Sequence, residues 1–511
     1  MATINTETVL YNETFYDSTF DHPCESEAVL PEYLPDVASV VRVDARPVLL
    51  DISYKNGRVE VEGRVECIVL YMPADGTLQS FFTRVPFDAT VTGEDFTPDM
   101  RFFAHIRMDS VVCRPVSGRK LAIRCVVTIT VQGEQTKEIS LASIPDVQVQ
   151  GLEFLTQNQK ISLWVQTTSD AFSLEEMLEL PADSPRMERI LKCDINAYPL
   201  ETRVSTGKVV VGGELSVSCL YMSNVDTGAT DQFRSVVPFN RVIEMPNVKE
   251  GDVVCVSFVV LENACGILED TSGEERILSC KVGLRADAIA YRNQDVMTVL
   301  DAYGKNQTVT IKENDAMVEV AQCIRCMDFV VSNSFRPREQ IVELYSAEAF
   351  ADVRDMDYEN GILHLRGDLL VTFLVSLIDG ETVGMDHLFP FDVSCEEVYN
   401  NYDDGVFIGE CRLEEFSYEM ASDGLIFVDA KLGCYTLARL QRNITAAQSV
   451  EVSLRSNPNE GKYLTLYYPM EGEALWEIGK RYATPIEEIR QANNLEGDVI
   501  PQGVKMLLIP R

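Results

Sequence analysis

Cys323 and Cys326 are spaced as in metal-binding and redox-active motifs. They form the only Cys-x-x-Cys motif among the 14 cysteines of the chain. Such a pair can supply half of a zinc site or act as a redox disulfide. A structural zinc ion needs four ligands, and no second Cys or His pair stands at suitable spacing. A thioredoxin-like role needs a βαβ context, which the surrounding pattern lacks. We therefore expect two strand or linker cysteines and no metal.

Residues 355–360 begin like a calcium-binding loop. The sixth position is Asn360 where that loop needs Gly, and the twelfth is Arg366 where it needs Glu. The Gly-x-Ser-x-Gly, His-Glu-x-x-His and Gly-x-x-x-x-Gly-Lys-Ser/Thr motifs of common enzyme classes are missing as well. Carboxylates are abundant in so acidic a chain, and no pair stands out as a glycosidase site. We expect no enzymatic activity and no cofactor.

The composition is that of a folded, strongly acidic protein of several domains. The chain has 511 residues, 46% of them hydrophobic, and 44 basic against 80 acidic side chains give a net charge of −36. Such a surface repels nucleic acid and anionic lipid. Residues 1–21 show no secretory signal pattern, and no apolar run reaches the roughly 20 residues that span a bilayer. We expect a cytoplasmic protein without membrane insertion.

The cysteines are scattered, many of them inside apolar runs that read as strands. Examples are Cys67, Cys125, Cys219 and Cys280. Because disulfides are rare in reducing compartments, we expect free buried thiols.

Four markers recur three times in the same order before residue 451. A first turn lies at Asn56-Gly57, Thr206-Gly207 and Asn360-Gly361, and a second glycine follows six residues later at Gly63, Gly213 and Gly367. A Pro-Phe marker stands at Pro86, Pro238 and Pro390, two steps of 152 residues, and a closing turn lies at Gly118, Gly273 and Gly424. Asn-Gly turns favour tight hairpins. The pattern predicts tandem antiparallel β-sandwich-like or open-barrel domains.

The predicted boundaries are an N-terminal extension at 1–29, repeats at 30–165, 173–322 and 328–450, a linker at 451–461 and a C-terminal module at 462–511. Residues 173–180 are expected to form a short helix, with Ser173 as N-cap and Glu176 completing a capping box.

The C-terminal module reads as strand, glycine turn, two helices and strand. Leu475, Ile478 and Tyr482 fall on one helical face. Thr484 is the expected N-cap of the second helix, with Pro485 as its first residue. Ile486, Ile489 and Ala492 form its expected inner face, and Asn493-Asn494 end it. Pro469 should end the first strand early. The module is therefore predicted to be a small α+β (βααβ) unit.

This order resembles a LysM module, a family that usually binds glycans containing N-acetylglucosamine. The triplicated pattern resembles the SPOCS domain, a spore-coat-associated domain of spore-forming Firmicutes. SPOCS repeats followed by LysM are similar to the SipL type of clostridial spore coat morphogenesis protein. The LysM resemblance implies a groove between two loops, with these partner- or glycan-binding residues: Gly472, Glu473, Ala474, Leu475, Trp476, Asn494, Leu495, Asp498, Val499 and Ile500.

The resemblance implies a non-enzymatic scaffold in the mother cell, located at the forespore surface and spore coat. Its expected partner is a coat morphogenetic ATPase of the SpoIVA type, and the SPOCS-like repeats would dock or self-associate. Glu473 and Ala474 replace the usual Asp and Thr of the LysM motif, which favours a protein partner over a glycan. The alternatives are a peptidoglycan- or cortex-binding protein and a LysM-targeted cell-wall hydrolase.

Overall fold

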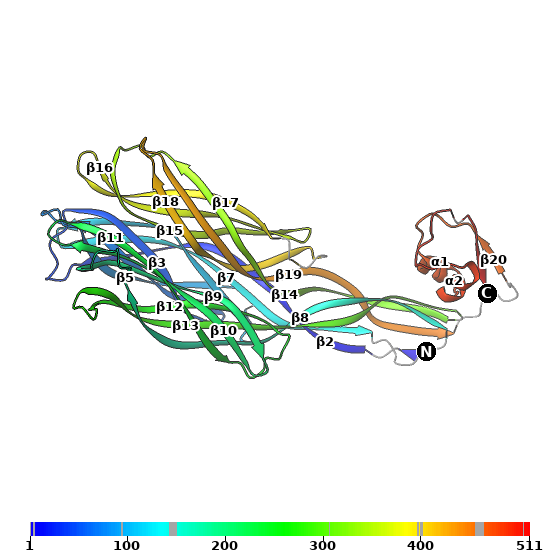
Figure 1. Ribbon diagram of the computed structural model, residues 1–511. Helices are drawn as coiled ribbons and strands as arrows, with labels where there is room; N and C mark the ends of the chain where they lie inside the picture. Colours follow the sequence, from blue (N-terminus) through cyan, green and yellow to red (C-terminus); the bar gives the residue numbers. More distant parts are fainter. Residues whose placement is uncertain are drawn as a thin grey trace.

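The computed structural model describes residues 2–3, 6–93, 96–142, 151–305, 307–395, 398, 402–454, 464–503 and 505–510. Strands dominate, in three units of six strands each, followed by a small α+β module (Figure 1). The predicted mainly β class with a small C-terminal α+β module is confirmed. The short strand β1 (Ala2–Thr3) pairs with β19 near the end of the third unit.

The six strands of each unit follow one another along the chain. The first unit has β2 (Thr6–Val29), β3 (Ser39–Lys55), β4 (Arg58–Met72), β5 (Gln79–Thr92), β6 (Arg101–Ser117) and β7 (Lys120–Ala142). The second has β8 (Leu152–Glu179), β9 (Arg189–Ser205), β10 (Lys208–Asn224), β11 (Ala229–Glu244), β12 (Val253–Glu269) and β13 (Glu275–Gly304). The third has β14 (Gln307–Phe335), β15 (Ile341–Glu359), β16 (Ile362–Leu377), β17 (Thr382–Cys395), β18 (Asp404–Met420) and β19 (Ile426–Leu454).

Each unit is a β-sandwich of two antiparallel three-stranded sheets. In the first unit the orders are β2-β7-β6 and β3-β4-β5, and the other units pair their corresponding strands in the same way. The inward side chains of both sheets share one apolar core in each unit. On β4, for example, Val59, Val61, Val65, Cys67 and Val69 are fully buried. This period of two is what a strand with one buried face requires.

The second glycine and the Pro-Phe marker of each repeat form one packing device. Gly63 lies directly opposite Phe87 in the β4–β5 pairing, and the Phe87 ring covers it so closely that a Cβ on Gly63 would lie within 3.0 Å of the ring. The relation recurs at Gly213 under Phe239 and at Gly367 under Phe391. Aromatic cover of a strand glycine restores the contacts that a missing side chain gives up.

The first and last strands of each unit extend beyond their sandwich. These six strands have 23 to 30 residues. They run together into a narrow stalk that leads toward the C-terminal module (Figure 1). A separate core in this region takes Val9, Ile139, Ile161, Val318 and Ile444 from five of the six strands. The three sandwiches are therefore joined by shared packing as well as by the chain.

Residues 173–180 are the end of β8, so the predicted helix is wrong. Ser173 pairs with Gly283 of β13, and alternate residues such as Leu174 and Leu178 pack on the core of the second unit. Cross-strand pairing therefore overrides the helical propensity of Leu, Glu and Met. The segment assigned to an N-terminal extension also differs, because β2 pairs with β7 along its length and completes the first sandwich.

The cysteines are mostly as expected, with one correction. Cys67, Cys125, Cys219 and Cys280 are free and buried. Cys411 and Cys434, on neighbouring strands with Cα atoms 4.4 Å apart, form a disulfide. The expectation of free thiols is therefore wrong for these two cysteines. The β18–β19 register places them directly opposite each other. Within the described residues, no helix has the length and apolar character needed to cross a membrane.

Candidate functional site

The C-terminal module consists of β20 (Leu464–Tyr467), α1 (Leu475–Tyr482), α2 (Ile486–Asn493) and β21 (Leu507–Pro510). The two strands pair antiparallel, and the helices bury Leu475, Ile478 and Ile489 completely between them and β21. Pro469 stands two residues beyond the end of β20, so the predicted early end of this strand is confirmed.

Thr484 does not cap α2 as predicted. The helix begins at Ile486 without a side-chain cap, and the Thr484 hydroxyl donates instead to the Pro510 carbonyl at 3.1 Å. Thr484 therefore joins α2 to the last strand. Ala492 is exposed, so its predicted place on the inner face is also wrong. The predicted helix end is confirmed, since Asn494 has φ 53° and Asn493 donates to Leu508 O at 2.7 Å.

The two predicted groove loops lie side by side and bond to each other through the backbone. The Gly472 N–H donates to Ile500 O at 3.1 Å, and the Ile500 N–H donates to Glu473 O at 2.9 Å. The Leu475 N–H donates to Asp498 O at 2.8 Å. Since these bonds use the inner backbone groups of both loops, side chains and outward-facing groups must supply any ligand contact.

Glu473 is turned into the module. Its carboxylate accepts the Tyr467 hydroxyl at 2.8 Å and the Met470 N–H at 3.0 Å, and Arg481 donates to the same hydroxyl at 2.7 Å. Burial, followed by the neighbouring carboxylate, raises the pKa of Tyr467. The Glu473 side chain is longer than that of the usual Asp, and its bonds to Tyr467 and Met470 stabilise the loop that precedes α1.

The ten predicted groove residues separate into three groups by burial. Leu475, Trp476, Leu495 and Ile500 are buried, Glu473 and Ala474 are half-buried, and Gly472, Asn494, Asp498 and Val499 are exposed. The structure thus brings both loops together but leaves four of the ten residues at the surface. A binding role for these residues remains a prediction.

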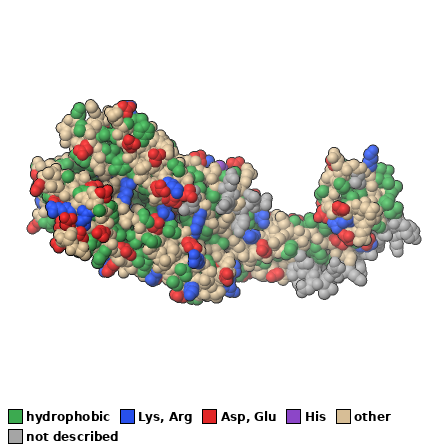
Figure 2. Space-filling view, viewed as in Figure 1, with side chains coloured by type: hydrophobic (Ala, Val, Ile, Leu, Met, Phe, Trp, Pro, Cys, Tyr) green, Lys and Arg blue, Asp and Glu red, His purple; other side chains and the backbone are tan. Residues whose placement is uncertain are grey.

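An exposed apolar stripe, missed in the sequence, runs along β20 and its continuation. Leu464, Leu466, Tyr468 and Met470 occupy alternate positions and are 53 to 78% exposed. Figure 2 shows hydrophobic side chains at the surface of this module. The period of two was visible in the sequence, but only the pairing of β20 with β21 shows which face points outward. An exposed apolar patch on a small module marks an interaction surface.

Trp476 packs against the stalk. Its ring lies 4.9 Å from that of Tyr303 near the end of β13, in an edge-on arrangement, and its indole N–H donates to Asp301 Oδ2 at 2.8 Å. Lys480 donates to the same oxygen at 2.6 Å, and the Tyr303 hydroxyl donates to Thr484 O at 2.9 Å. Lys305 pairs with Glu488 at 2.9 Å. Trp476 is therefore an anchor between the module and the β units.

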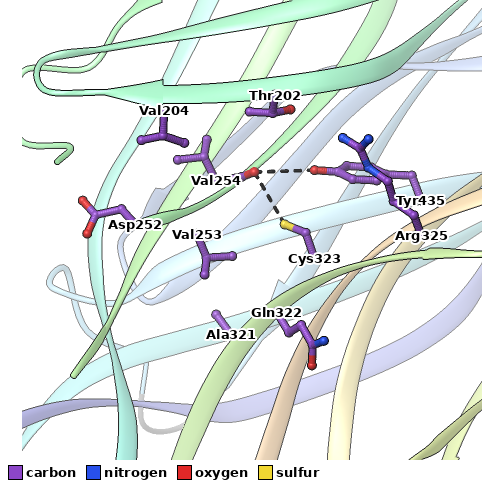
Figure 3. A pocket seen from close by; sticks show the side chains of 10 residues that line it. All are labelled: Thr202, Val204, Asp252, Val253, Val254, Ala321, Gln322, Cys323, Arg325 and Tyr435. Atoms are coloured by element: carbon purple, nitrogen blue, oxygen red, sulfur yellow. Dashed lines mark hydrogen bonds between the residues drawn. The ribbon is translucent and has the colours of Figure 1, made fainter. Parts of the chain in front are cut away.

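A cavity of about 300 Å³ lies between the second and third units (Figure 3). Its lining includes Cys323, whose thiol donates to Val254 O at 3.5 Å, and Tyr435, whose hydroxyl donates to the same carbonyl. Asp252 at its edge is held by Arg292 at 2.8 Å. The Asp252 carboxylate is paired, and none of the described residues that line the cavity is a histidine. Cys323 and Cys326 both lie on β14, as predicted for strand cysteines.

Comparison with protein-family models places both predicted domain types in the chain. The SipL, SPOCS domain model matches residues 36–116 and 186–268, and the LysM domain model matches residues 471–510. The chain therefore carries two segments that match the SPOCS domain and one that matches the LysM domain. The matches cover β3–β6 and β9–β12, and the third unit has the same strand order although no match falls on it. Neither domain type is a catalytic family.

No curated protein and no solved structure matches the chain. The SPOCS and LysM matches support a spore-coat-associated protein that carries a LysM module, in agreement with the sequence-based prediction.

Proposed function

We propose that this SPOCS–LysM protein is a non-enzymatic scaffold of spore coat assembly. The LysM module captures a coat morphogenetic ATPase of the SpoIVA type at the forespore surface, on the mother-cell side. The observation that carries this proposal is the apolar stripe of Leu464, Leu466, Tyr468 and Met470, which lies on the LysM module and points to solvent. Aromatic and Met side chains of this kind are enriched in protein interfaces.

The geometry of the module supports a protein partner in two further ways. The Glu473 carboxylate accepts hydrogen bonds from Tyr467 and Met470, so the residue that replaces the usual Asp stabilises the loop. Trp476 is engaged with Tyr303, so the tryptophan in the first turn of α1 holds the module to the stalk. The stripe on β20 is an apolar surface that the described part of the module presents to solvent.

The test is binding of the full chain to the purified ATPase by biolayer interferometry. The triple variant Leu466→Ala, Tyr468→Ala, Met470→Ala should weaken binding at least about tenfold, or about 1.4 kcal/mol, since a few apolar anchors carry most of the binding energy of an interface. The matched control, Phe350→Ala with Leu388→Ala, removes side chains of comparable exposure from the third unit. Equal affinity of the triple variant and the unmodified chain would remove the basis of the proposal.

A second candidate is binding of peptidoglycan or cortex glycan, favoured by the LysM match and by the exposed Gly472, Asn494 and Asp498 on the paired loops. Titration calorimetry of the full chain with chito-oligosaccharide at millimolar concentration tests it. Heat that disappears in Asn494→Ala but persists in the β20 triple variant would favour the glycan.

A further inference from the structure

Twelve of the 14 cysteines lie in the three sandwich cores, four in each unit. The third unit uses two of its four in the disulfide between Cys411 and Cys434. The second unit holds Cys193 on β9, Cys219 on β10, Cys265 on β12 and Cys280 on β13, all with free thiols. This cluster, hereafter the second-unit tetrad, has no part in the function proposed above.

Three of the four thiols in the tetrad form a compact group. The Sγ atoms of Cys193, Cys265 and Cys280 all lie within 4.8 Å of one another, and they form the one such group of possible metal ligands in the part of the chain that the structure describes. Cys265 Sγ lies 3.1 Å from Cys193 Sγ and 3.7 Å from Cys280 Sγ. Cys219 stands directly opposite Cys193 in the β10–β9 pairing and is fully buried.

These separations suit a tetrahedral thiolate site. With Zn–S bonds of about 2.3 Å, the sulfur atoms around a tetrahedral zinc ion lie about 3.8 Å apart. The three measured thiols need to move by less than the length of one bond to reach that arrangement. Thiolate ligands in tetrahedral geometry select Zn²⁺ among the common divalent cations.

The position of the tetrad in the sandwich gives it an entry path. β9 and β12 are edge strands of their sheets, and they contribute the half-buried Cys193 and Cys265. β10 and β13 are central strands and contribute the buried Cys219 and Cys280. The four cysteines therefore come from both sheets, where the edge strands β9 and β12 meet, and the two half-buried thiols leave a path for an ion from solvent. Asn263 donates to the Cys193 carbonyl at 3.4 Å and helps to fix that ligand.

We propose that Cys193, Cys219, Cys265 and Cys280 bind one Zn²⁺ ion that joins the two sheets of the second SPOCS unit. Binding replaces four S–H bonds by four Zn–S bonds and releases four protons to solvent, with no change of oxidation state. The ligands come from four strands separated in sequence, so Cys-x-x-Cys spacing could not reveal them.

The first experiment measures bound metal in the full chain, purified in reductant and reconstituted with Co²⁺. Cys265→Ser should lose about one equivalent of cobalt per chain, together with tetrahedral thiolate absorption bands, relative to the unmodified protein. Cys255→Ser is the matched control, since Cys255 lies on the same strand, is half-buried and is outside the tetrad; it should bind cobalt as the unmodified chain does. Equal cobalt content in Cys265→Ser and the unmodified chain overturns the proposal.

A second measurement on the unmodified chain avoids any folding defect of the variant. Zn²⁺ should protect Cys193 and Cys265 from alkylation by iodoacetamide at least about tenfold, while Cys255 reacts at an unchanged rate. Equal alkylation of Cys193 and Cys265 with and without zinc contradicts the site. So does recovery of the tetrad as disulfides from protein purified in reductant.

Discussion

Arg439 donates to Glu134 at 3.1 Å although the two residues are 305 positions apart, and their side chains are 1% and 0% exposed. Tyr291 donates to the same carboxylate oxygen at 2.9 Å. The three residues lie on β7, β13 and β19, the last strand of each unit. One buried carboxylate therefore receives a donor from both other units, which specifies how the three sandwiches meet at the head of the stalk.

Removing the guanidinium from this network should destabilise the protein strongly. Arg439→Met leaves Glu134 buried with fewer donors, and breaking one side of a buried ion pair costs about 3 to 5 kcal/mol. Urea unfolding followed by circular dichroism measures the loss. Arg203→Met is the control, since its pair with Glu201 has side chains 74% and 57% exposed, and exposed pairs of this kind contribute little to stability.

The double variant Glu134→Gln with Arg439→Met tests the cause. If the penalty comes from an uncompensated charge, the double variant should recover part of the stability that Arg439→Met loses. A double variant less stable than the single one would contradict this account.

The packing of Phe239 on Gly213 predicts different outcomes for substitution of two adjacent glycines. Gly213→Ala should cost about 1 to 3 kcal/mol, because its new Cβ meets the Phe239 ring within 3.0 Å. At Gly212 the nearest atom, Asn240 Oδ1, would lie 3.4 Å from a Cβ, and Gly212→Ala should change stability by less than about 1 kcal/mol. Melting temperatures of the two variants check this, and equal melting temperatures would show that the ring yields.

Glu410 gives the stability a defined pH dependence. Burial, followed by the charge of Asp287, raises the pKa of Glu410 from its usual 4.5 to about 7. The folded chain thus holds a proton between those values that the unfolded chain releases, so stability falls as pH rises from about 4.5 through 7. Glu410→Gln should therefore raise stability by about 3 kcal/mol at pH 8 and change it little at pH 4.

Glu419→Gln is the control for this prediction, since Glu419 lies on the same strand and is exposed. Its melting temperature should follow that of the unmodified protein at both pH values. A Glu410→Gln variant with the same gain at pH 4 and pH 8 would show that the effect is packing and not titration.

Local turn chemistry explains why the three β units were predictable. Asn56 and Asn360 take φ of 51° and 52° at the start of tight hairpins, as Asn-Gly sequences favour. The helix predicted at residues 173–180 failed because its pairing partner, β13, lies about a hundred residues further along the chain. The helical propensity of residues 173–180 carries no information about the strand with which they pair.

The candidate site was predictable only in part for the same reason. The two LysM loops follow from a local motif, and the structure brings them together. The contact of Trp476 with Tyr303 joins residues 173 positions apart, and the tetrad joins four strands. A single sequence holds no local signal for such contacts, whereas the alternation of Leu464, Leu466, Tyr468 and Met470 could have been recognised as an apolar face.

The docked position of the LysM module depends on Tyr303. Its ring packs on Trp476, and its hydroxyl satisfies the Thr484 carbonyl. Tyr303→Ala removes an aromatic pair worth about 0.5 to 1.5 kcal/mol beyond its buried area and leaves that carbonyl without its donor. We expect the module to separate from the stalk. Trp476, 7% exposed when docked, should then enter water and shift its fluorescence emission to longer wavelength, and small-angle scattering should show a longer particle.

Tyr468→Ala is the matched control, since Tyr468 lies in the same module and is 72% exposed. It should leave both the emission and the scattering profile unchanged while weakening capture of the ATPase. Tyr303→Ala keeps the β20 stripe intact, so it should bind the ATPase at least as well as the unmodified chain. An unchanged Trp476 emission in Tyr303→Ala would mean that the Tyr303 contact does not hold the module in solution. The bonds of Asp301 to Trp476 and Lys480, and the pair of Lys305 with Glu488, would then be enough to keep the module docked.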